Sequence, residues 1–507
     1  MTSDETAAFA NRPSVTPPPG ETEAWETATR EVGSLLDPEA VAVVGASNTE
    51  GKPGYALVEN IRINGYDGAV YPINPKETEI QGLKAYPSIE DVPTDVDTAL
   101  FVVPGHIIPD IVPSCAEKGV TSIVVVSAGF GEAVDADRQE MQAEIAEACR
   151  QHGIRAIGPN TTGMVSMKRD FVASFVPFPR WHDGNVALAA QTGIFAGVYM
   201  EELMAREVQK LGYNYSLALG NKMDLDETEF VKYAGQDDDV DVVQLHLECI
   251  RKPAEFFPAA GHVASSKPVV LLKTGRTPEG RAASRWHTAS TPGPDDEVTN
   301  ACRANGVVRA DTVPEFMNYA KGFSYQPAPR GRNVAVLSLS GANAVMAADY
   351  VSDSMLDLAS LSEETLETVK ALVPDWQPVR NPIDQWLALP SGAREAQEVP
   401  LNAVLADDNV DAVVTIHLAT DEPDFDGIGD VYRDAMADHP EKPVLSYVMG
   451  AEVKDGWIES MEGTGVPVYE SAVEAIKTLE QMYWWRRYTD GEAAYDSSLP
   501  TRNDRVL

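Results

Sequence analysis

The sequence contains little cysteine and no long apolar segment. Its four cysteines, among 507 residues, are widely spaced and form no CxxC pair. This spacing argues against a zinc knuckle or a disulfide framework, so we expect buried or partly buried thiols and no metal ligands. No stretch approaches the roughly 20 apolar residues of a membrane-spanning helix. We therefore expect a globular protein without membrane contact.

The first 35 residues lack the features of an export signal. They are acidic and rich in proline, and they have neither a basic start nor an apolar core. A secretory signal peptide has both of these features. We therefore predict a disordered segment at residues 1–35 and a cytoplasmic location.

Basic residues are scarce relative to acidic ones. Lys and Arg number 40 and Asp and Glu number 78, which gives a formal net charge of −38. This charge repels a phosphate backbone and excludes nucleic acid as a partner. The acidic residues are spread along the chain, which suggests the solvated surface of a halophilic protein. On this hypothesis, structure or activity is lost at low salt because the like charges are no longer screened.

The sequence does contain a repeated alternation of short apolar runs and helix-like segments. Its length suits about three domains of ordinary size. The alternation begins near Pro38 and predicts α/β domains with parallel sheets. The expected order is a Rossmann-like domain at residues 36–164, two flavodoxin-like domains at residues 165–325 and 331–489, and a C-terminal tail at residues 490–507.

A glycine-rich turn joins the first predicted strand to the helix that follows. Gly45 ends the strand, and Gly51 and Gly54 precede the helix. Backbone amides in such a turn can approach phosphate oxygens closely. The pattern does not fit GxGxxG, and Lys76 follows the second strand where a nicotinamide-binding domain usually has an acid. A lysine there suits a phosphorylated ribose, as in coenzyme A (CoA), although a simple surface lysine is the alternative.

A series of short motifs runs along most of the chain, from about Pro38 to Tyr488. In order, they read GASNTEGKPG, YPINPK, SAGFGE, GPNTTG, AAQTG, GNKMD, KPVVLLKTGR, WHTAS, RNPID and VPVYES. This ordered series resembles the NDP-forming acyl-CoA synthetase family, which includes the α subunits of succinyl-CoA ligase and ADP-forming acetyl-CoA synthetase. The resemblance implies a CoA-binding Rossmann domain followed by two succinyl-CoA synthetase-like domains.

The resemblance also implies which residues bind CoA. In the family, the glycine-rich turn and the lysine after the second strand hold CoA, and the stretch similar to SAGFGE lines the same domain. Gly129 in that stretch has the alternative role of a simple turn glycine. The implied CoA ligands are Gly45, Ser47, Gly51, Lys52, Gly54, Lys76, Val103, Pro104, Ser127, Gly129, Gln191, Thr192 and Gly193.

The second predicted domain opens with a turn of its own. Gln191, Thr192 and Gly193 follow a strand at residues 185–190, and we expect a helix from about Ile194. Amides at the start of a helix bind anions. By resemblance, this turn faces the transferred phosphate and the thiol end of CoA. The family usually has Ser-Gln-Ser-Gly here, so one of its two hydroxyls is lost.

His287 lies in a segment rich in Gly, Ser, Thr and Pro, which predicts a loop. By resemblance it carries phosphate, Glu248 hydrogen-bonds it, and Asn160 lies near the acyl phosphate. This chemistry requires a neutral imidazole whose second nitrogen donates to an acceptor. The family motif is Ser-His-Thr-Gly-Ser, whereas Trp286 and Ala289 flank the His-Thr pair here. Loss of the glycine removes backbone freedom if the turn uses a positive φ.

Other polar residues in the motifs have less specific roles. Thr161 and Thr162 stand where the family commonly has Cys or Ser followed by Leu. They predict a more polar acyl site, with completion of a turn as the alternative. Asn221 and Asp224 are interpreted first as scaffolding, because Asn and Asp often cap helices.

The sequence has no segment similar to the ATP-grasp module that the family reaction also needs. The resemblance therefore implies a β subunit that binds ATP or ADP with Mg²⁺, in an α2β2 hetero-oligomer or alongside an α homodimer. The predicted function is that of an acid:CoA ligase α subunit. Phosphate attacks an acyl-CoA, and His287 then passes the phosphoryl group from the acyl phosphate to ADP. The reverse reaction makes acyl-CoA from acid, CoA and ATP.

Two other functions stay open. The altered WHTAS and AAQTG motifs are compatible with a non-catalytic or regulatory acyl-CoA-binding subunit. An NAD(P)-dependent oxidoreductase is a further alternative, which the missing acid near Lys76 disfavours.

Overall fold

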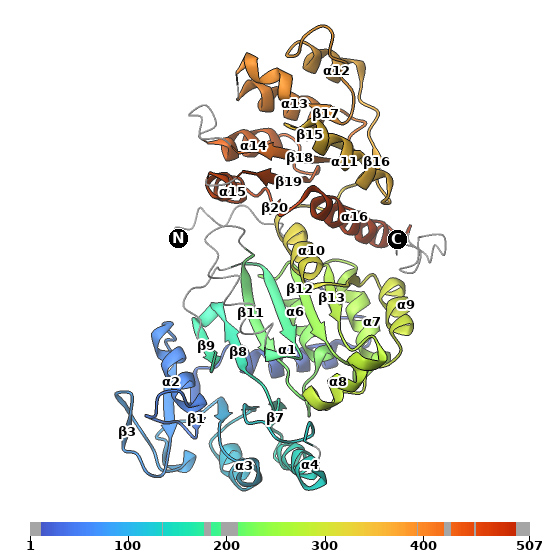
Figure 1. The fold of residues 1–507 in the computed structure, drawn as a ribbon. Coiled ribbons are helices and arrows are strands. Elements are labelled where there is room, and N and C mark those ends of the chain that lie inside the picture. Colours follow the sequence, from blue (N-terminus) through green and yellow to red (C-terminus); the bar gives the residue numbers. More distant parts are fainter. Residues whose placement is uncertain are drawn as a thin grey trace. The chain divides into compact units, whose positions relative to one another are not determined.

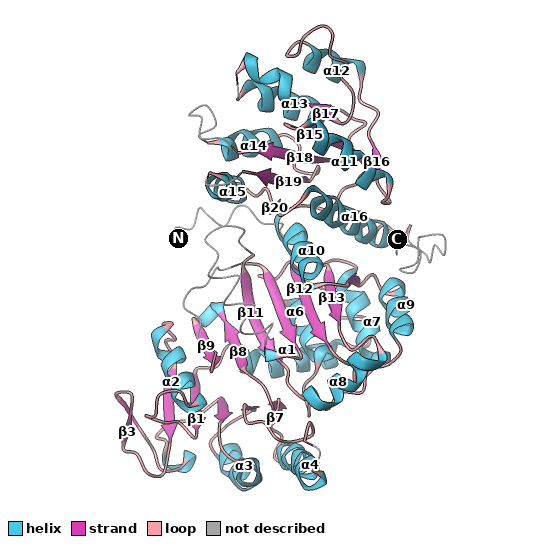
Figure 2. Cartoon of the chain, in the orientation of Figure 1, coloured by secondary structure: helices cyan, strands magenta, loops and turns pink. Residues whose placement is uncertain are grey.

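The structure is a computed structural model that describes residues 12–133, 135–176, 184–193, 211–392, 394–419, 427–450 and 453–492. These residues form two compact units, whose elements are labelled in Figure 1. The first unit is made of the described residues between Arg12 and Asp311, apart from Leu211. The second unit is made of Leu211 and the described residues from Thr312 onward. Within each unit, helices flank the sheets (Figure 2).

The N-terminal sheet of the first unit is five-stranded and parallel, with the order β2-β1-β5-β6-β7. Strand β1 is buried along its whole length, as expected for a continuous apolar run in a sheet covered on both faces. This is the predicted Rossmann-like arrangement. Its elements are β1 (Ala40–Val44), α2 (Pro53–Ile63), β2 (Ala69–Ile73), β3 (Glu79–Ile80), β4 (Leu83–Lys84), β5 (Thr98–Phe101), α3 (Ile108–Glu117), β6 (Ser122–Val125), α4 (Ala136–Gln151) and β7 (Arg155–Ile157).

The second sheet of this unit is seven-stranded, with the order β14-β13-β12-β10-β11-β8-β9. Five of its strands are parallel, but β8 pairs antiparallel with β11, and β9 pairs antiparallel with β8. The sequence did not predict this hairpin. The elements are β8 (Gly163–Ser166), β9 (Phe171–Ser174), β10 (Val186–Ala190), β11 (Tyr213–Ala218), α6 (Glu227–Gln236), β12 (Val242–Leu247), α7 (Pro253–Ala264), β13 (Val269–Lys273), α8 (Pro278–Thr288), α9 (Asp295–Ala304) and β14 (Val308–Ala310).

The predicted disorder of residues 1–35 is wrong for residues 22–35, which form a helix. Helix α1 (Thr22–Leu36) buries Trp25, Val32 and Leu35 and packs against α6. The apolar residues recur at helical spacing among acidic ones, so the acidic composition masks an amphipathic stripe. Residues 1–11 lie outside the described residues.

The second unit contains a six-stranded parallel sheet with the order β16-β15-β18-β19-β20, in which β17 also pairs with β15. Helix α10 packs against α16 in this unit, whereas we expected the preceding domain to extend to residue 325. The elements are α10 (Val313–Tyr325), β15 (Asn333–Ser338), α11 (Gly341–Ser352), β16 (Asp357–Leu358), α12 (Glu363–Lys370), β17 (Ile383–Asp384), α13 (Glu395–Ala406), β18 (Ala412–Leu418), α14 (Ile428–Ala437), β19 (Val444–Met449), α15 (Lys454–Glu462), β20 (Val468–Tyr469) and α16 (Ala472–Thr489).

Among the described residues, no helix combines the length and the apolar character needed to cross a bilayer.

Candidate active site

His287 lies in the last turn of helix α8, so the prediction of a loop is wrong. Pro278 occupies the first turn, and the Thr277 hydroxyl accepts a hydrogen bond from the Gly280 amide at 3.1 Å, which caps the helix start. The helix buries few side chains, which explains the missing apolar periodicity. It ends at Ala289, whose φ of 56° is left-handed. The His287 side chain remains 53% exposed.

Glu248 lies directly after β12 and forms a hydrogen bond with His287. Its Oε1 is 2.5 Å from His287 Nδ1, and its Oε2 accepts a hydrogen bond of 2.6 Å from the Thr288 hydroxyl. Burial favours a raised pKa for Glu248, but the hydrogen bonds from His287 and Thr288 prevail and lower it. The hydrogen bond to Glu248 raises the pKa of His287, against the opposing effect of burial. In this geometry an ionised Glu248 holds the proton on Nδ1, which leaves Nε2 as the basic nitrogen.

Gln191 follows β10 and is almost fully buried. Its Oε1 accepts hydrogen bonds from the amides of Glu248 and Cys249, at 2.9 and 3.1 Å. Its Nε2 donates to the hydroxyls of Thr288 and Ser290. The side chain is therefore engaged within the protein.

The other residues of this turn are partly described. Thr192 is buried, and Gly193 is the last residue described before a gap. A Cβ on Gly193 would lie 2.2 Å from the Thr162 methyl carbon, so this close approach requires glycine. The helix expected from Ile194 lies outside the described residues.

Asn160 contacts the backbone of the histidine segment. Its Nδ2 donates to the carbonyl oxygen of His287 at 3.1 Å and lies 3.4 Å from Asn221 Oδ1. Asn221 in turn donates to Glu132 Oε2 at 2.6 Å. Thr161 completes a turn: its hydroxyl donates to the carbonyl oxygen of residue 218 at 2.5 Å and accepts from the amide of residue 163 at 3.0 Å. The hydrogen bonds of Asn160 and Asn221 join the end of α8 to the loop after β6.

The loops after β1 and β2 meet at one edge of the N-terminal sheet. Gly45 has a φ of 95°, and a Cβ there would lie 2.8 Å from the Val102 carbonyl oxygen. A Cβ on Gly54 would lie 2.3 Å from the Gly45 carbonyl oxygen. Asn74 ties the two loops together, because it donates to the Ala46 carbonyl oxygen at 2.8 Å. These close approaches require glycine, and the loops lie at the edge where open parallel sheets usually bind ligands.

The remaining predicted CoA ligands lie in the same group of loops. Lys52 caps the start of α2 through its backbone, and Lys76 is exposed in the loop after β2. The Ser127 hydroxyl donates to the Val103 carbonyl oxygen at 2.7 Å, which joins the loops after β5 and β6. Gly129 has a φ of 95°. After β2 the chain crosses to the other side of β1, so the strand order reverses between β1 and β5, which is the usual place for a ligand in an open α/β sheet.

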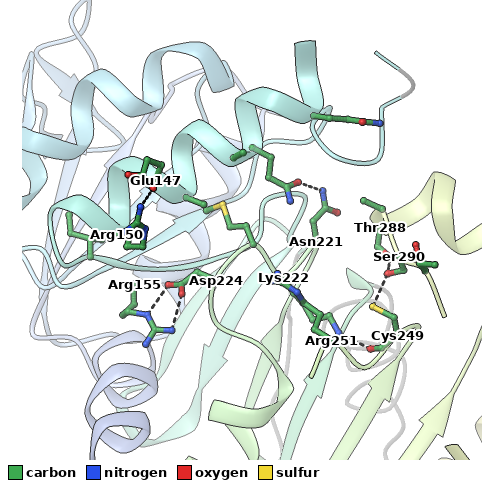
Figure 3. Close-up of a pocket in the computed structure, with 18 of the residues that line it drawn as sticks. Glu147, Arg150, Arg155, Asn221, Lys222, Asp224, Cys249, Arg251, Thr288 and Ser290 are labelled. Carbon is green, nitrogen blue, oxygen red and sulfur yellow. Dashed lines mark hydrogen bonds and ion pairs between the residues drawn. The ribbon is translucent and has the colours of Figure 1, made fainter. Parts of the chain in front are cut away.

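A cleft of about 880 Å³ borders the histidine segment (Figure 3). Helix α4 forms one side, and the loops after β11 and β12 and the end of α8 form the other. Lys222, which the sequence did not single out, has its ammonium group buried there. It donates to Glu227 Oε2 and to the Cys249 carbonyl oxygen, both at 2.7 Å. A lysine in a Gly-Asn-Lys turn directly after an apolar strand, with a glutamate five residues later, is the sequence signal that could have identified it.

Two family models match the chain. One is described as a CoA binding domain and matches residues 39–167, and the other is described as a succinyl-CoA ligase like flavodoxin domain and matches residues 183–323. A relative from Archaeoglobus fulgidus, acetate–CoA ligase [ADP-forming] II, is 34% identical over 91% of this chain and 68% of its own length. The α subunit of acetate–CoA ligase [ADP-forming] II from Pyrococcus furiosus is 32% identical over 86% of this chain and 94% of its own.

The chain belongs to the NDP-forming acyl-CoA synthetase family. The members of this family are acid–thiol ligases, and this synthetase shares their CoA-binding domain and flavodoxin-like domain. A solved structure, dinucleotide-forming acetyl-coenzyme A synthetase 1 of Ca. Korarchaeum cryptofilum in complex with phosphate and ADP, has the same fold. It superimposes with a TM-score of 0.82 at 28% identity, covering 92% of this chain and 99% of that one. The predicted family and fold class are thus confirmed.

Proposed function

We propose that this synthetase is the α subunit of an ADP-forming acid:CoA ligase and that His287 carries the phosphoryl group. The observation that supports this role most directly is the 2.5 Å contact between His287 Nδ1 and Glu248 Oε1, on a side chain that is 53% exposed. The carboxylate stabilises the charge that the ring acquires on phosphorylation. The exposed part of the ring is free to meet a phosphorylated substrate.

The reaction proceeds in three transfers. A phosphate oxygen attacks the thioester carbon, the C–S bond breaks, and CoA leaves as the thiol with a proton from phosphate. His287 Nε2 then attacks phosphorus, the bond from phosphorus to the acyl oxygen breaks, and the carboxylate leaves with the electron pair. Finally, a terminal oxygen of ADP attacks the same phosphorus, and the P–N bond breaks to give ATP and neutral imidazole.

CoA binds, in this proposal, at the loop edge of the N-terminal sheet. The glycine turn from Gly45 to Gly54 provides backbone amides for its phosphates, and Lys76 pairs with the phosphate on its ribose. Asn74 supports this arrangement because it ties the two loops together. The loop containing Ser127 and Gly129 leads from this edge toward Glu132, whose carboxylate reaches Asn221 beside the histidine segment.

The nucleotide requires a partner in this proposal. Two relatives are named α subunits, and the chain spans 94% and 98% of their lengths. Other relatives are longer, and the chain spans 62% and 49% of two of them. The α-subunit names of the first two relatives support a partner, which we propose is an ATP-grasp β subunit that holds ADP or ATP with Mg²⁺, in a hetero-oligomer such as α2β2. His287 must then move between the CoA side and the nucleotide.

The substrate, in this proposal, is a small carboxylic acid. Relatives carry names that specify acetate, 4-hydroxybutyrate and trans-feruloyl-CoA. Trp286, next to His287, is 70% exposed and offers an apolar surface beside the reacting group. We take acetyl-CoA as the first thioester to test, followed by 4-hydroxybutyryl-CoA and feruloyl-CoA.

Incubation of the full chain with acetyl-CoA and labelled orthophosphate tests this function. We expect protein-bound label that is stable in base and labile in acid, as a phosphoramidate is. The label should be absent in His287→Ala and present in His152→Ala, which removes an exposed histidine at the end of α4. Absence of label with all three thioesters, with or without a copurified partner, would contradict turnover and favour the acyl-CoA-binding subunit.

A further inference from the structure

Several buried polar side chains around Glu248 have no role in the transfers described above. They are Gln191, Thr288 and Ser290, which are between 1% and 3% exposed. We propose that Gln191 and Thr288 are positioning residues: they fix the Glu248 carboxylate, and through it the tautomer of His287 that attacks phosphorus. This inference rests on the proposed phosphohistidine function.

The orientation of the Gln191 amide is determined by the backbone. The amides of Glu248 and Cys249 can only donate, so the atom that lies 2.9 and 3.1 Å from them must be the side-chain oxygen. The Gln191 nitrogen therefore faces Thr288 and Ser290 and donates to both. The Gln191 side chain thus links the backbone directly after β12 to the side chains at the end of α8 through hydrogen bonds.

The direction of the Thr288 hydroxyl follows from its neighbours. The Gln191 nitrogen, at 3.2 Å, is a donor, and an ionised Glu248 Oε2, at 2.6 Å, is an acceptor. The hydroxyl proton of Thr288 must therefore point to Glu248. Ser290 lies 2.7 Å from the same hydroxyl and, because that proton is already used, donates its own to Thr288.

The arrangement satisfies its members without a proton on Glu248. Cys249 donates to the Ser290 hydroxyl at 3.4 Å, and Gln191 donates its second hydrogen there as well. Glu248 accepts from Thr288 on one oxygen and faces His287 Nδ1 with the other. Because the carboxylate cannot rotate without breaking the Thr288 hydrogen bond, Nδ1 keeps its proton and Nε2 stays basic.

The test compares substitutions at two threonines of one segment. Thr288→Val keeps the shape of the side chain and removes the donor, whereas Thr288→Ser keeps the hydroxyl. Thr291→Val is the matched control, since Thr291 is exposed three residues further on. We expect Thr288→Val to slow labelling of His287 from acetyl-CoA and labelled phosphate by about 10- to 100-fold, the usual effect of losing a hydrogen bond to a charged group. Thr288→Ser should restore most of the rate.

The affinity for acetyl-CoA, measured by calorimetry, should be unchanged in all three variants. Equal labelling rates in Thr288→Val and Thr291→Val would overturn the inference. So would a loss of acetyl-CoA affinity in Thr288→Val that matches its loss of rate, because the effect would then be general damage to the fold.

A second measurement separates this inference from the proposed function. In chains labelled with ¹⁵N-histidine, the nitrogen shifts of His287, assigned by comparison with His287→Gln, report which nitrogen holds the proton. We expect a proton on Nδ1 in the unaltered chain and a mixture of tautomers in Thr288→Val. An unchanged tautomer in Thr288→Val would overturn the positioning role. A chain that takes up no label but shows this tautomer shift would contradict the proposed function alone.

Discussion

Ala289 ends helix α8 with a positive φ of 56°, in the position where the family has glycine. A left-handed conformation costs an alanine roughly 1–2 kcal/mol, whereas a glycine adopts it without steric strain. From the sequence we expected the loss of glycine to restrict the backbone if this turn used a positive φ, and Ala289 does have a positive φ. The chain therefore keeps the turn at an energetic cost.

Replacement of Ala289 by glycine should relieve this strain. We expect Ala289→Gly to raise the free energy of unfolding by about 0.5–1 kcal/mol, after allowance for the greater entropy of glycine in the unfolded chain. Denaturant unfolding measures the change. Ala282→Gly, at an exposed position inside the same helix, is the control and should lower stability by about 1 kcal/mol. A decrease in both variants would show that the left-handed turn stores no strain.

The pH dependence of phosphorylation should report the pairing of His287 with Glu248. The hydrogen bond to Glu248 raises the pKa of His287 above its ordinary value of about 6.5. Only the neutral ring attacks phosphorus, so the labelling rate should fall as the pH drops through this raised pKa. In Glu248→Gln the negative charge is gone, and we expect a slower rate whose acid limb lies at lower pH. An unshifted acid limb in this variant would argue against the pairing in solution.

The sequence predicted the residues of this pair better than their surroundings. His287 and Glu248 lie in separate motifs, and each motif indicates one partner of the hydrogen bond. The roles of Gln191 and Thr288 depend on which way an amide and a hydroxyl point, and no spacing in the sequence encodes that direction. Asn160 was expected beside an acyl group, but its amide reaches the backbone of His287.

Helix α1 is a whole element that the sequence did not predict, whereas it did predict buried parallel strands. Continuous apolar runs such as β1 identified the buried strands, because parallel strands are covered on both faces. In α1 the apolar residues recur at helical spacing but stand among acidic ones, and α8 buries few side chains, so composition suggested disorder or a loop. The short strands β8 and β9 were missed because four residues carry too little pattern.

Helix α1 should be part of the stable fold. It contacts both sheets of the first unit, through β6 and β8. Arg155, at the start of β7, also pairs with Glu31, and Gln236 on α6 donates to the Trp25 carbonyl oxygen at 3.2 Å. The Trp25 ring is fully buried and packs edge-on against His262 with ring centroids 5.3 Å apart. Removal of α1 would therefore expose surface on two sheets.

Substitution of Trp25 tests this role. We expect Trp25→Ala to lower the free energy of unfolding by about 3–5 kcal/mol, the usual result of deleting a buried aromatic ring. Glu26→Ala, on the exposed side of the same helix, should change it by no more than about 0.5 kcal/mol. Denaturant unfolding distinguishes the two variants, and similar small changes in both would mean that α1 is not integral to the fold.

The charge of the whole molecule sets its dependence on salt. With a formal net charge of −38, the carboxylates repel one another, and the range of that repulsion falls from about 10 Å at 0.1 M salt to about 3 Å at 1 M. We propose on this basis that the protein is adapted to high salt. The thermal midpoint should rise between about 0.1 M and about 1 M KCl. Equal midpoints at both concentrations would remove the argument for a halophilic protein.

The hydrogen bond from Asn160 reaches the main chain of residue 287 and not its ring. Any residue at this position keeps that carbonyl, so the last turn of α8 stays anchored when the imidazole is replaced. In the proposed reaction, a His287→Gln chain therefore lacks the phosphate carrier, while the end of α8 stays in place. In that reaction the variant can form acyl phosphate but cannot take up its phosphoryl group, which makes it the form to crystallise with acyl phosphate and CoA.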